Sequence, residues 1–292
     1  MYRALADAIR DAEAQGKSLA RIALETEALD QGRPVEEIRD ALRRALHVMR
    51  SAADRGLAGD LKSVSGLVGG DAAKLRLTQS PVSGPLFRDI LARALAVQEV
   101  NAAMGVIVAA PTAGGAGVLP AVLTGLAESR HIGDEALVDA LATAGLIGAV
   151  VAERASLSGA EGGCQAETGA AAGMAAGAAT EMLGGTPAQV GHAVALAQQA
   201  TLGLICDPLG GLVELPCVFR NATGAAIALS AVEMALAGIE FAIPADEVID
   251  VMGEIGREMD VRYRETAGGG LAATPTGRRL ARERLVQIKR KG

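Results

Sequence analysis

Three cysteines are the residues of this chain best suited to chemistry. Cys164, Cys206 and Cys217 are the only cysteines among the 292 residues, and they lie 42 and 11 positions apart. Each stands among glycines or beside a proline, where the chain changes direction and backbone N–H groups are free. A thiolate is a metal ligand and a nucleophile, and free N–H groups at a helix start stabilise it. The stretch from Ser158 to Asn221 therefore predicts a site for a group bound through several sulfurs.

The spacing of the cysteines leaves three interpretations open. An iron–sulfur cluster held by three thiolates keeps one iron free to act as a Lewis acid. A zinc ion is the competing metal, but close Cys-x-x-Cys pairs are missing and His192 is the one histidine nearby in sequence. Three inert buried thiols are the third interpretation, because free cysteine is among the most buried residue types.

A loop that carries a lysine is a second candidate for chemistry. The segment LKSVSGLVGGDAAKL, within residues 59–77, fits neither a helix nor a strand well and matches no phosphate-binding motif. Its Lys62, Ser63 and Ser65 could bind a carboxylate. A solvated surface loop is the alternative, and spacing alone favours that alternative because most loops lie at the surface.

A stretch of 28 residues without charge, from Val100 to Ala127, is long enough to span a membrane. Its Pro111, its Pro120 and its TAGGAG run would leave backbone groups unsatisfied in lipid. A buried loop between core helices is therefore the preferred interpretation. The glycines predict close approach of the backbone to another group, or else a tight helix crossing that needs small residues.

Composition narrows the class of protein. The net charge of −6 and the pI of about 5.3 argue against nucleic-acid binding. Three cysteines suit no secreted disulfide scaffold, and the charged segment from Met1 to Leu29 does not read as a signal peptide, so we expect the reducing cytoplasm. Half of the residues are hydrophobic but only 2% are aromatic, so the core must consist of small aliphatic side chains on closely packed helices.

Helical patterns cover most of the chain, and no alternating pattern of useful length predicts a strand. Two short helices broken near Gly16 are expected before residue 30. Later helices are expected to start at Pro34, Pro85, Pro120, Asp134, Gln165, Thr186, Val218 and Pro244, and the basic segment GRRLARERLVQIKRKG is expected to form a last, solvated helix. The prediction is an all-α fold in which residues 1–58 form an N-terminal helical layer and residues 59–292 carry the site. The two parts are expected to make one globular domain with long glycine-rich loops.

Four segments together resemble a known family. They read KSVSGLVGGDAAKL, APTAGGAGVLPAVL, SGAEGGCQAETGAAAGMAA and LGLICDPLGGLVELPCVFRNA, and the resemblance that they carry runs from about Lys62 to Ala225. In their order and in the cysteine spacing they resemble the α chain of iron–sulfur-dependent L-serine dehydratase. The more distantly similar cysteine desulfidases are the alternative family.

The resemblance implies an all-helical iron–sulfur catalytic domain over residues 59–292 and a [4Fe–4S] cluster held by Cys164, Cys206 and Cys217. It also implies conversion of L-serine to pyruvate and ammonia, with the open iron on the substrate hydroxyl. Candidate catalytic residues are Lys62 as base or carboxylate-binding cation, with Ser65 and Thr112 orienting the substrate. Candidate substrate-binding residues are Ser63, Gly66, Gly114, Gly115, Arg220 and Asn221. Arg220 and Asn221 could instead lie in the second shell of the cluster, and Asp207 is expected to fix the loop after Cys206.

One departure from the family pattern predicts a partner. Single-chain members carry a further domain with a Ser-Ser-Ser-His-Thr-like motif, and that motif is missing here. A separate β chain is therefore expected to complete the site in a hetero-oligomer. A cysteine desulfidase, and more remotely a non-enzymatic membrane or scaffold protein, are the alternative functions.

Overall fold

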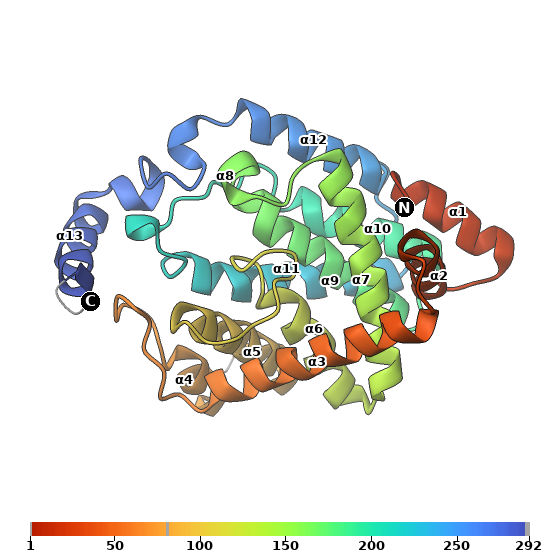
Figure 1. The fold of residues 1–292 in the computed structure, drawn as a ribbon, viewed down its shortest axis with the longest axis horizontal. Coiled ribbons are helices and arrows are strands. Elements are labelled where there is room, and N and C mark those ends of the chain that lie inside the picture. Colours follow the sequence, from red (N-terminus) through yellow and green to blue (C-terminus); the bar gives the residue numbers. More distant parts are fainter. Residues whose placement is uncertain (1, 80–81, 290–292) are drawn as a thin grey trace.

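The architecture is helical throughout the described part of the chain. The computed structural model describes residues 2–79 and 82–289 (Figure 1). Within these residues there is no β-strand, and the only strand-like feature is an isolated bridge between Cys206 and Arg264. The prediction of an all-α fold is confirmed.

One small-residue helix lies at the centre of the molecule. Helix α9 (Ala170–Met182) is buried along nearly its whole length and packs against α6 (Val118–Arg130), α7 (Asp134–Arg154), α10 (Pro187–Gln199) and α11 (Cys217–Leu236). Its sequence AAAGMAAGAATEM lets the neighbours approach closely. A Cβ atom added at Gly177, for example, would lie 2.4 Å from Cδ1 of Ile147. The core is thus built from close helix contacts, as the composition predicts.

The N-terminal helices cover one side of this core. They are α1 (Leu5–Gln15), α2 (Leu19–Gln31) and α3 (Val35–Leu57), and the first two end at Gly16 and Gly32 in the left-handed conformation. The predicted break near Gly16 is confirmed. Helix α1 contacts α10 and α12, α2 contacts α7, and α3 contacts both α5 and α7. The boundary at residue 58 stays a prediction.

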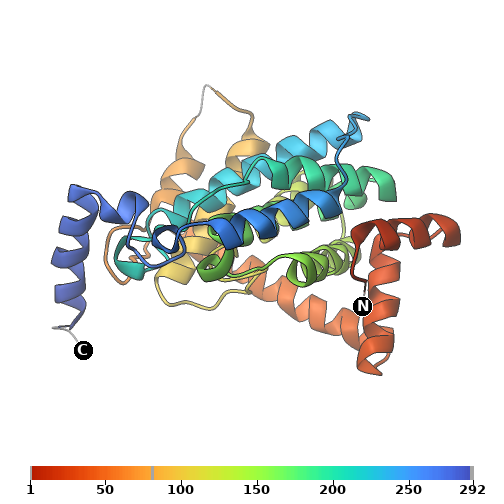
Figure 2. The same cartoon turned by 90° about the horizontal axis from the view of Figure 1, so that it is seen from above.

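The remaining helices frame the site. They are α4 (Asp71–Leu77), α5 (Pro85–Ala102), α8 (Gly159–Gly162), α12 (Ala245–Glu258) and α13 (Pro275–Lys289), with a π-helical turn η1 (Gln165–Gly169) and 3-10 turns η2 (Leu209–Gly211), η3 (Val261–Tyr263) and η4 (Gly270–Ala273). Helix α13 stands apart from the main body and packs on η2 and η4 (Figures 1 and 2). The basic end of the chain beyond Lys289 lies outside the described residues.

The charge-free segment forms no membrane helix. Residues 100–127 comprise the end of α5, an irregular loop and most of α6. A different helix, α7, is long and apolar enough to cross a membrane, but 67% of its most apolar window is buried within this protein. Burial against α9 and the N-terminal layer accounts for its composition.

Candidate metal centre

The three cysteines converge although they come from separate loops. Cys164 lies between α8 and η1, Cys206 lies in the irregular stretch after α10, and Cys217 is the first residue of α11. All three thiols are free, and each residue is at most 4% exposed. The pKa of Cys164 responds to Cys206, and the pKa of Cys217 responds to the charge on Cys164.

The surroundings favour one negative charge among the three thiols. The hydrogen bond from Cys206 lowers the pKa of Cys164, with help from the Thr168 hydroxyl at 3.3 Å and the Arg220 guanidinium. The same hydrogen bond and burial raise the pKa of Cys206, while burial raises that of Cys217. A bound cation or cationic cluster would stabilise the negative charges, so that all three thiols could ionise together.

The cysteine arrangement fits a cluster better than a single ion. Among the residues that the structure describes, no three His, Cys, Asp or Glu side chains are grouped to hold one metal ion, as a structural zinc site requires. The thiolates of an iron–sulfur cluster bind different irons, so they need not meet at one point. Three buried, reduced thiols with cationic and hydroxyl neighbours are a suitable donor set for such a cluster.

A clamp from the C-terminal region holds the second cysteine. The N–H of Cys206 donates to the carbonyl of Tyr263 at 2.8 Å, and the carbonyl of Cys206 accepts from the N–H of Glu265 at 2.9 Å. Asp207 extends the clamp because its carboxylate accepts from the N–H of Leu271 at 2.6 Å and pairs with Arg220 at 2.8 Å. The predicted role of Asp207 in fixing this loop agrees with these contacts.

A buried carboxyl group beside the thiols escaped the sequence-based site prediction. Glu167 lies in the π-helical turn after Cys164, and its Oε2 is 4.0 Å from Sγ of Cys206. The hydroxyl of Thr112 donates to Oε1 at 2.7 Å. Burial above all, together with the charge on Cys164, raises the pKa of Glu167 to about 7. The sequence does contain one indication of its importance: Glu167 is the one charged residue between Gly162 and Glu181.

The glycine-rich loop after α5 wraps around this carboxyl group. A Cβ atom at Gly114 would lie 2.7 Å from both carboxylate oxygens of Glu167, and one at Gly115 would lie 2.8 Å from its carbonyl oxygen. Asn221, which is fully buried, donates to the carbonyls of Gly114 and Cys217 and accepts from the N–H of Gly117. The contacts thus agree with the predicted close approach of this loop to another group.

The other candidates of α11 bind the protein framework. Arg220 donates to the carbonyl of Ile205 at 2.9 Å in addition to its ion pair with Asp207. Arg220 and Asn221 were expected either to bind substrate or to support the surroundings of the cysteines. These bonds agree with the second role. Binding of a substrate carboxylate by either residue stays a prediction.

The lysine-bearing loop lies beside the site but does not enter it. Ser65 donates its hydroxyl to Oε2 of Glu214 and its N–H to Oε1 at 2.9 Å, while the hydroxyl of Ser63 accepts from the N–H of Val68. Lys62 and Gly66 are exposed. The two serines fix the loop, and the desolvation that a lysine base needs is not provided for Lys62 by this chain alone. Their catalytic and binding roles stay predictions.

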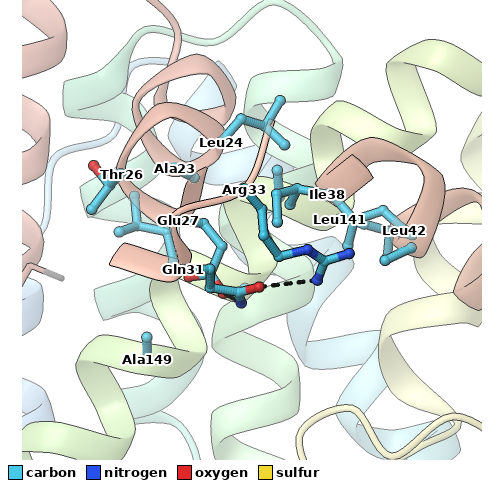
Figure 3. Close-up of a pocket in the computed structure, with 14 residues that line it drawn as sticks. Ala23, Leu24, Thr26, Glu27, Gln31, Arg33, Ile38, Leu42, Leu141 and Ala149 are labelled. Atoms are coloured by element: carbon cyan, nitrogen blue, oxygen red, sulfur yellow. Dashed lines mark hydrogen bonds between the residues drawn. The ribbon is translucent and has the colours of Figure 1, made fainter. Parts of the chain in front are cut away.

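A cavity of about 360 Å³ elsewhere in the molecule is a different feature. It lies between α2, α3 and α7, and Figure 3 shows its aliphatic walls with Arg33 bonded to Gln31 at the rim. None of the cysteines lines it. The chemistry of the thiols and of Glu167 therefore belongs to the loop cluster and not to this cavity.

Comparison with known proteins identifies the family of this chain. The chain matches the family described as serine dehydratase alpha chain over residues 14–272, and it belongs to that family. A probable L-serine dehydratase alpha chain of Bacillus subtilis is 52% identical over 85% of this chain and 83% of its own length. The L-serine dehydratase alpha chain of Peptoniphilus asaccharolyticus is 40% identical over 94% of both chains. The L-serine dehydratase of Streptomyces coelicolor is 43% identical over 93% of this chain but only 60% of its own length.

Proposed function

We propose that this chain is the α chain of an iron–sulfur-dependent L-serine dehydratase, which converts L-serine to pyruvate and ammonia. Membership of the serine dehydratase alpha chain family supports the reaction. The observation that carries the cofactor is the convergence of Cys164, Cys206 and Cys217 at a buried point next to Glu167. A shared cluster would account for the approach of three thiols that lie so far apart in the sequence.

The reaction removes a proton from Cα and hydroxide from Cβ of serine, which leaves an aminoacrylate that tautomerises and hydrolyses. When bound, the cluster supplies a Lewis-acidic iron for the substrate hydroxyl. Oε2 of Glu167 faces the thiols and is placed to exchange a proton with a substrate held there. Thr112 orients this carboxyl group through its hydrogen bond to Oε1, and the small residues Gly114 and Gly115 let the loop close over it.

A separate β chain completes the enzyme in this proposal. Relatives that are named as alpha chains are matched over 83% and 94% of their lengths, whereas the Streptomyces coelicolor enzyme continues well beyond the matched part. A cytoplasmic location is part of the same proposal. It agrees with free, buried thiols, which persist in a reducing compartment.

The deciding experiment is anaerobic purification followed by measurement of iron and acid-labile sulfide per chain. We expect close to four of each in the wild type and a large loss in the Cys164→Ala, Cys206→Ala and Cys217→Ala variants. Pyruvate formation from L-serine and from L-cysteine, each with and without the β chain, then separates a dehydratase from a desulfidase. A chain without iron, or one that prefers cysteine, would contradict the proposal.

A further inference from the structure

Exposed apolar side chains gather beside the loops that form the site. Met104 is 81% exposed, Val106 is 77% exposed and Val64 is 43% exposed. Met104 and Val106 belong to the same loop as Thr112, which binds Glu167. Val64 is adjacent because its N–H donates to the carbonyl of Ala102 at 3.0 Å. These three residues are called the loop patch below.

The backbone conformation of Met104 is unfavourable for a long apolar side chain, and no contact within the described part of this chain accounts for it. Met104 has a φ of 63°, a left-handed conformation that glycine adopts at the end of a helix at little cost. A long apolar side chain here is strained, and its exposure means that burial within this chain does not compensate. Methionine is enriched where two proteins meet because it is apolar and adapts its shape.

A second apolar surface lies next to the first. Leu209, Leu215, Phe219, Leu271 and Leu280 are among the residues that line a hollow of about 310 Å³ beneath α13. Ser65, which follows Val64, is bonded to Glu214, which precedes Leu215, so the hollow and the loop patch are neighbours. Figures 1 and 2 both place α13, η2 and the loop before α4 at the same end of the molecule.

We propose that the loop patch and the hollow beneath α13 together form the docking surface for the β chain. The inference rests on the proposed two-chain enzyme. In the Streptomyces coelicolor relative, the part that matches this chain is covalently joined to a further 40% of polypeptide, which is thereby held close to the matched part. If that further polypeptide packs on a surface that borders the site, its side chains can contribute to the site. The exposed arginines Arg278 and Arg282 on α13 suit an acidic rim on the partner.

The docking surface also explains the exposure of Lys62. This residue lies two positions before Val64 and is open to water in the isolated chain. A partner that covers Val64 would also remove water from Lys62. Docking would therefore place a desolvated lysine at the edge of the completed site.

The test compares two double variants that each replace two exposed apolar residues. Met104→Lys with Val106→Lys alters the loop patch. Leu29→Lys with Ile239→Lys is the control, since Leu29 is 82% exposed on α2 and Ile239 is 49% exposed. Ile239 follows the far end of α11, a helix of 20 residues or about 30 Å from Cys217. Each chain is titrated with the purified β chain of the same organism by isothermal calorimetry, and iron content and thermal midpoint are measured alongside.

We expect the loop-patch variant to bind the β chain at least about tenfold more weakly, as for central interface residues, while the control binds like the wild type. Iron content should be unchanged in both variants. Equal affinity of the wild type and the loop-patch variant would overturn the docking surface and leave the two-chain enzyme intact. A wild-type chain that binds no β chain and is fully active alone would overturn the two-chain enzyme itself. Self-association of the wild type that the loop-patch substitutions abolish, without any effect on β-chain affinity, would reassign the patch to contacts between copies.

Discussion

Glu167 is the side chain to which the proposed mechanism assigns proton exchange. Its carboxyl group is buried, receives a hydrogen bond from Thr112 and faces the thiol of Cys206. Burial disfavours the charged form of a carboxyl group and so raises its pKa, which makes proton exchange near neutral pH easier. The position of this residue between the glycine loop and the cysteines is what a proton carrier for serine would need.

A prediction for this residue concerns Glu167→Gln, which keeps the shape of the side chain and removes its proton exchange. We expect serine-dependent pyruvate formation by the reconstituted two-chain enzyme to fall by at least about 100-fold, the usual contribution of acid–base catalysis. Iron per chain should be retained, because the amide still accepts the hydrogen bond of Thr112. The matched control is Glu161→Gln, which lies three residues before Cys164 as Glu167 lies three after it, and which is exposed. Similar activity in the two variants would exclude Glu167 from the reaction.

At the scale of elements, irregular loops do the positioning and helices provide the support. The loop before α6 needs glycines because it lies against η1, and the stretch around Cys206 needs a partner segment because no helix fixes it. Asn221 and Asp207 tie these loops to α11 and to the C-terminal region. Changes in the loops should therefore disturb the site more than similar changes in exposed helix positions.

Two glycine-to-alanine substitutions test this difference. Gly115→Ala would bring a Cβ within 2.8 Å of a backbone oxygen of Glu167, and we expect a loss of about 1–3 kcal/mol in the free energy of unfolding. Gly145→Ala, within α7, meets nothing within 4 Å, and we expect a gain of about 0.5–1 kcal/mol from reduced chain entropy. Urea denaturation of both variants shows whether the free energy of unfolding falls or rises in each. A neutral Gly115→Ala would show that the loop is free to move away from η1.

The clamp on Cys206 gives a separate prediction. Asp207→Ala removes a fully buried carboxylate from Arg220 and from the N–H of Leu271, so we expect a loss of about 3 kcal/mol in the free energy of unfolding. Hydrogen exchange should also become faster at the amides of Cys206 and Glu265, which the clamp protects. The control is Asp260→Ala, an exposed residue nearby whose loss should cost less than about 1 kcal/mol. If hydrogen exchange at these amides is unchanged in Asp207→Ala, the backbone bridge to Tyr263 holds Cys206 in place without Asp207.

At the scale of the whole molecule, surface ion pairs fasten the N-terminal layer to the core. Arg39 and Arg43 of α3 both bind Glu135 at the start of α7. These hydrogen bonds, from Arg43 above all, lower the pKa of Glu135 to about 2. A carboxylate with a lowered folded-state pKa stabilises the fold above its ordinary pKa, and this contribution is lost as the pH falls toward 2.

Glu135→Gln should therefore lower the thermal midpoint at pH 7, and the difference from the wild type should shrink as the pH falls from about 4.5 toward 2. The difference should also shrink in 1 M salt, because Glu135 is exposed to solvent and Arg43 is partly exposed. Calorimetry at pH 7 and pH 2.5, each at low and high salt, measures both effects. A difference that is constant with pH would assign the effect of Glu135 to packing.

Much of the fold follows from local signals in the sequence. Prolines and glycines mark the helix ends, and Thr186 forms the capping box that starts α10. The excess of alanine and glycine predicts close helix packing. Short α4 was missed because its start is stabilised from a distance, by Glu99 accepting N–H groups of Gly70, Asp71 and Ala72.

The three cysteines could be selected as candidate ligands from the sequence alone. The identity of the thiols follows from their rarity and spacing, whereas the role of Glu167 depends on burial by a loop that lies more than fifty residues earlier. Ser65 is the opposite case. The sequence made it a candidate for orienting the substrate, but its hydroxyl donates a hydrogen bond to Glu214. Which polar groups are already satisfied is a property of the tertiary structure.

The bridge between Cys206 and the segment from Tyr263 to Glu265 has a consequence for biogenesis. During translation, Cys164, Cys206 and Cys217 leave the ribosome well before the residues that hold Cys206 in place. Domains form during synthesis only as far as their contacts have emerged. In the proposed enzyme, delivery of iron and sulfide is therefore a late event, and nascent chains stalled before residue 263 should expose three cysteines to oxidants.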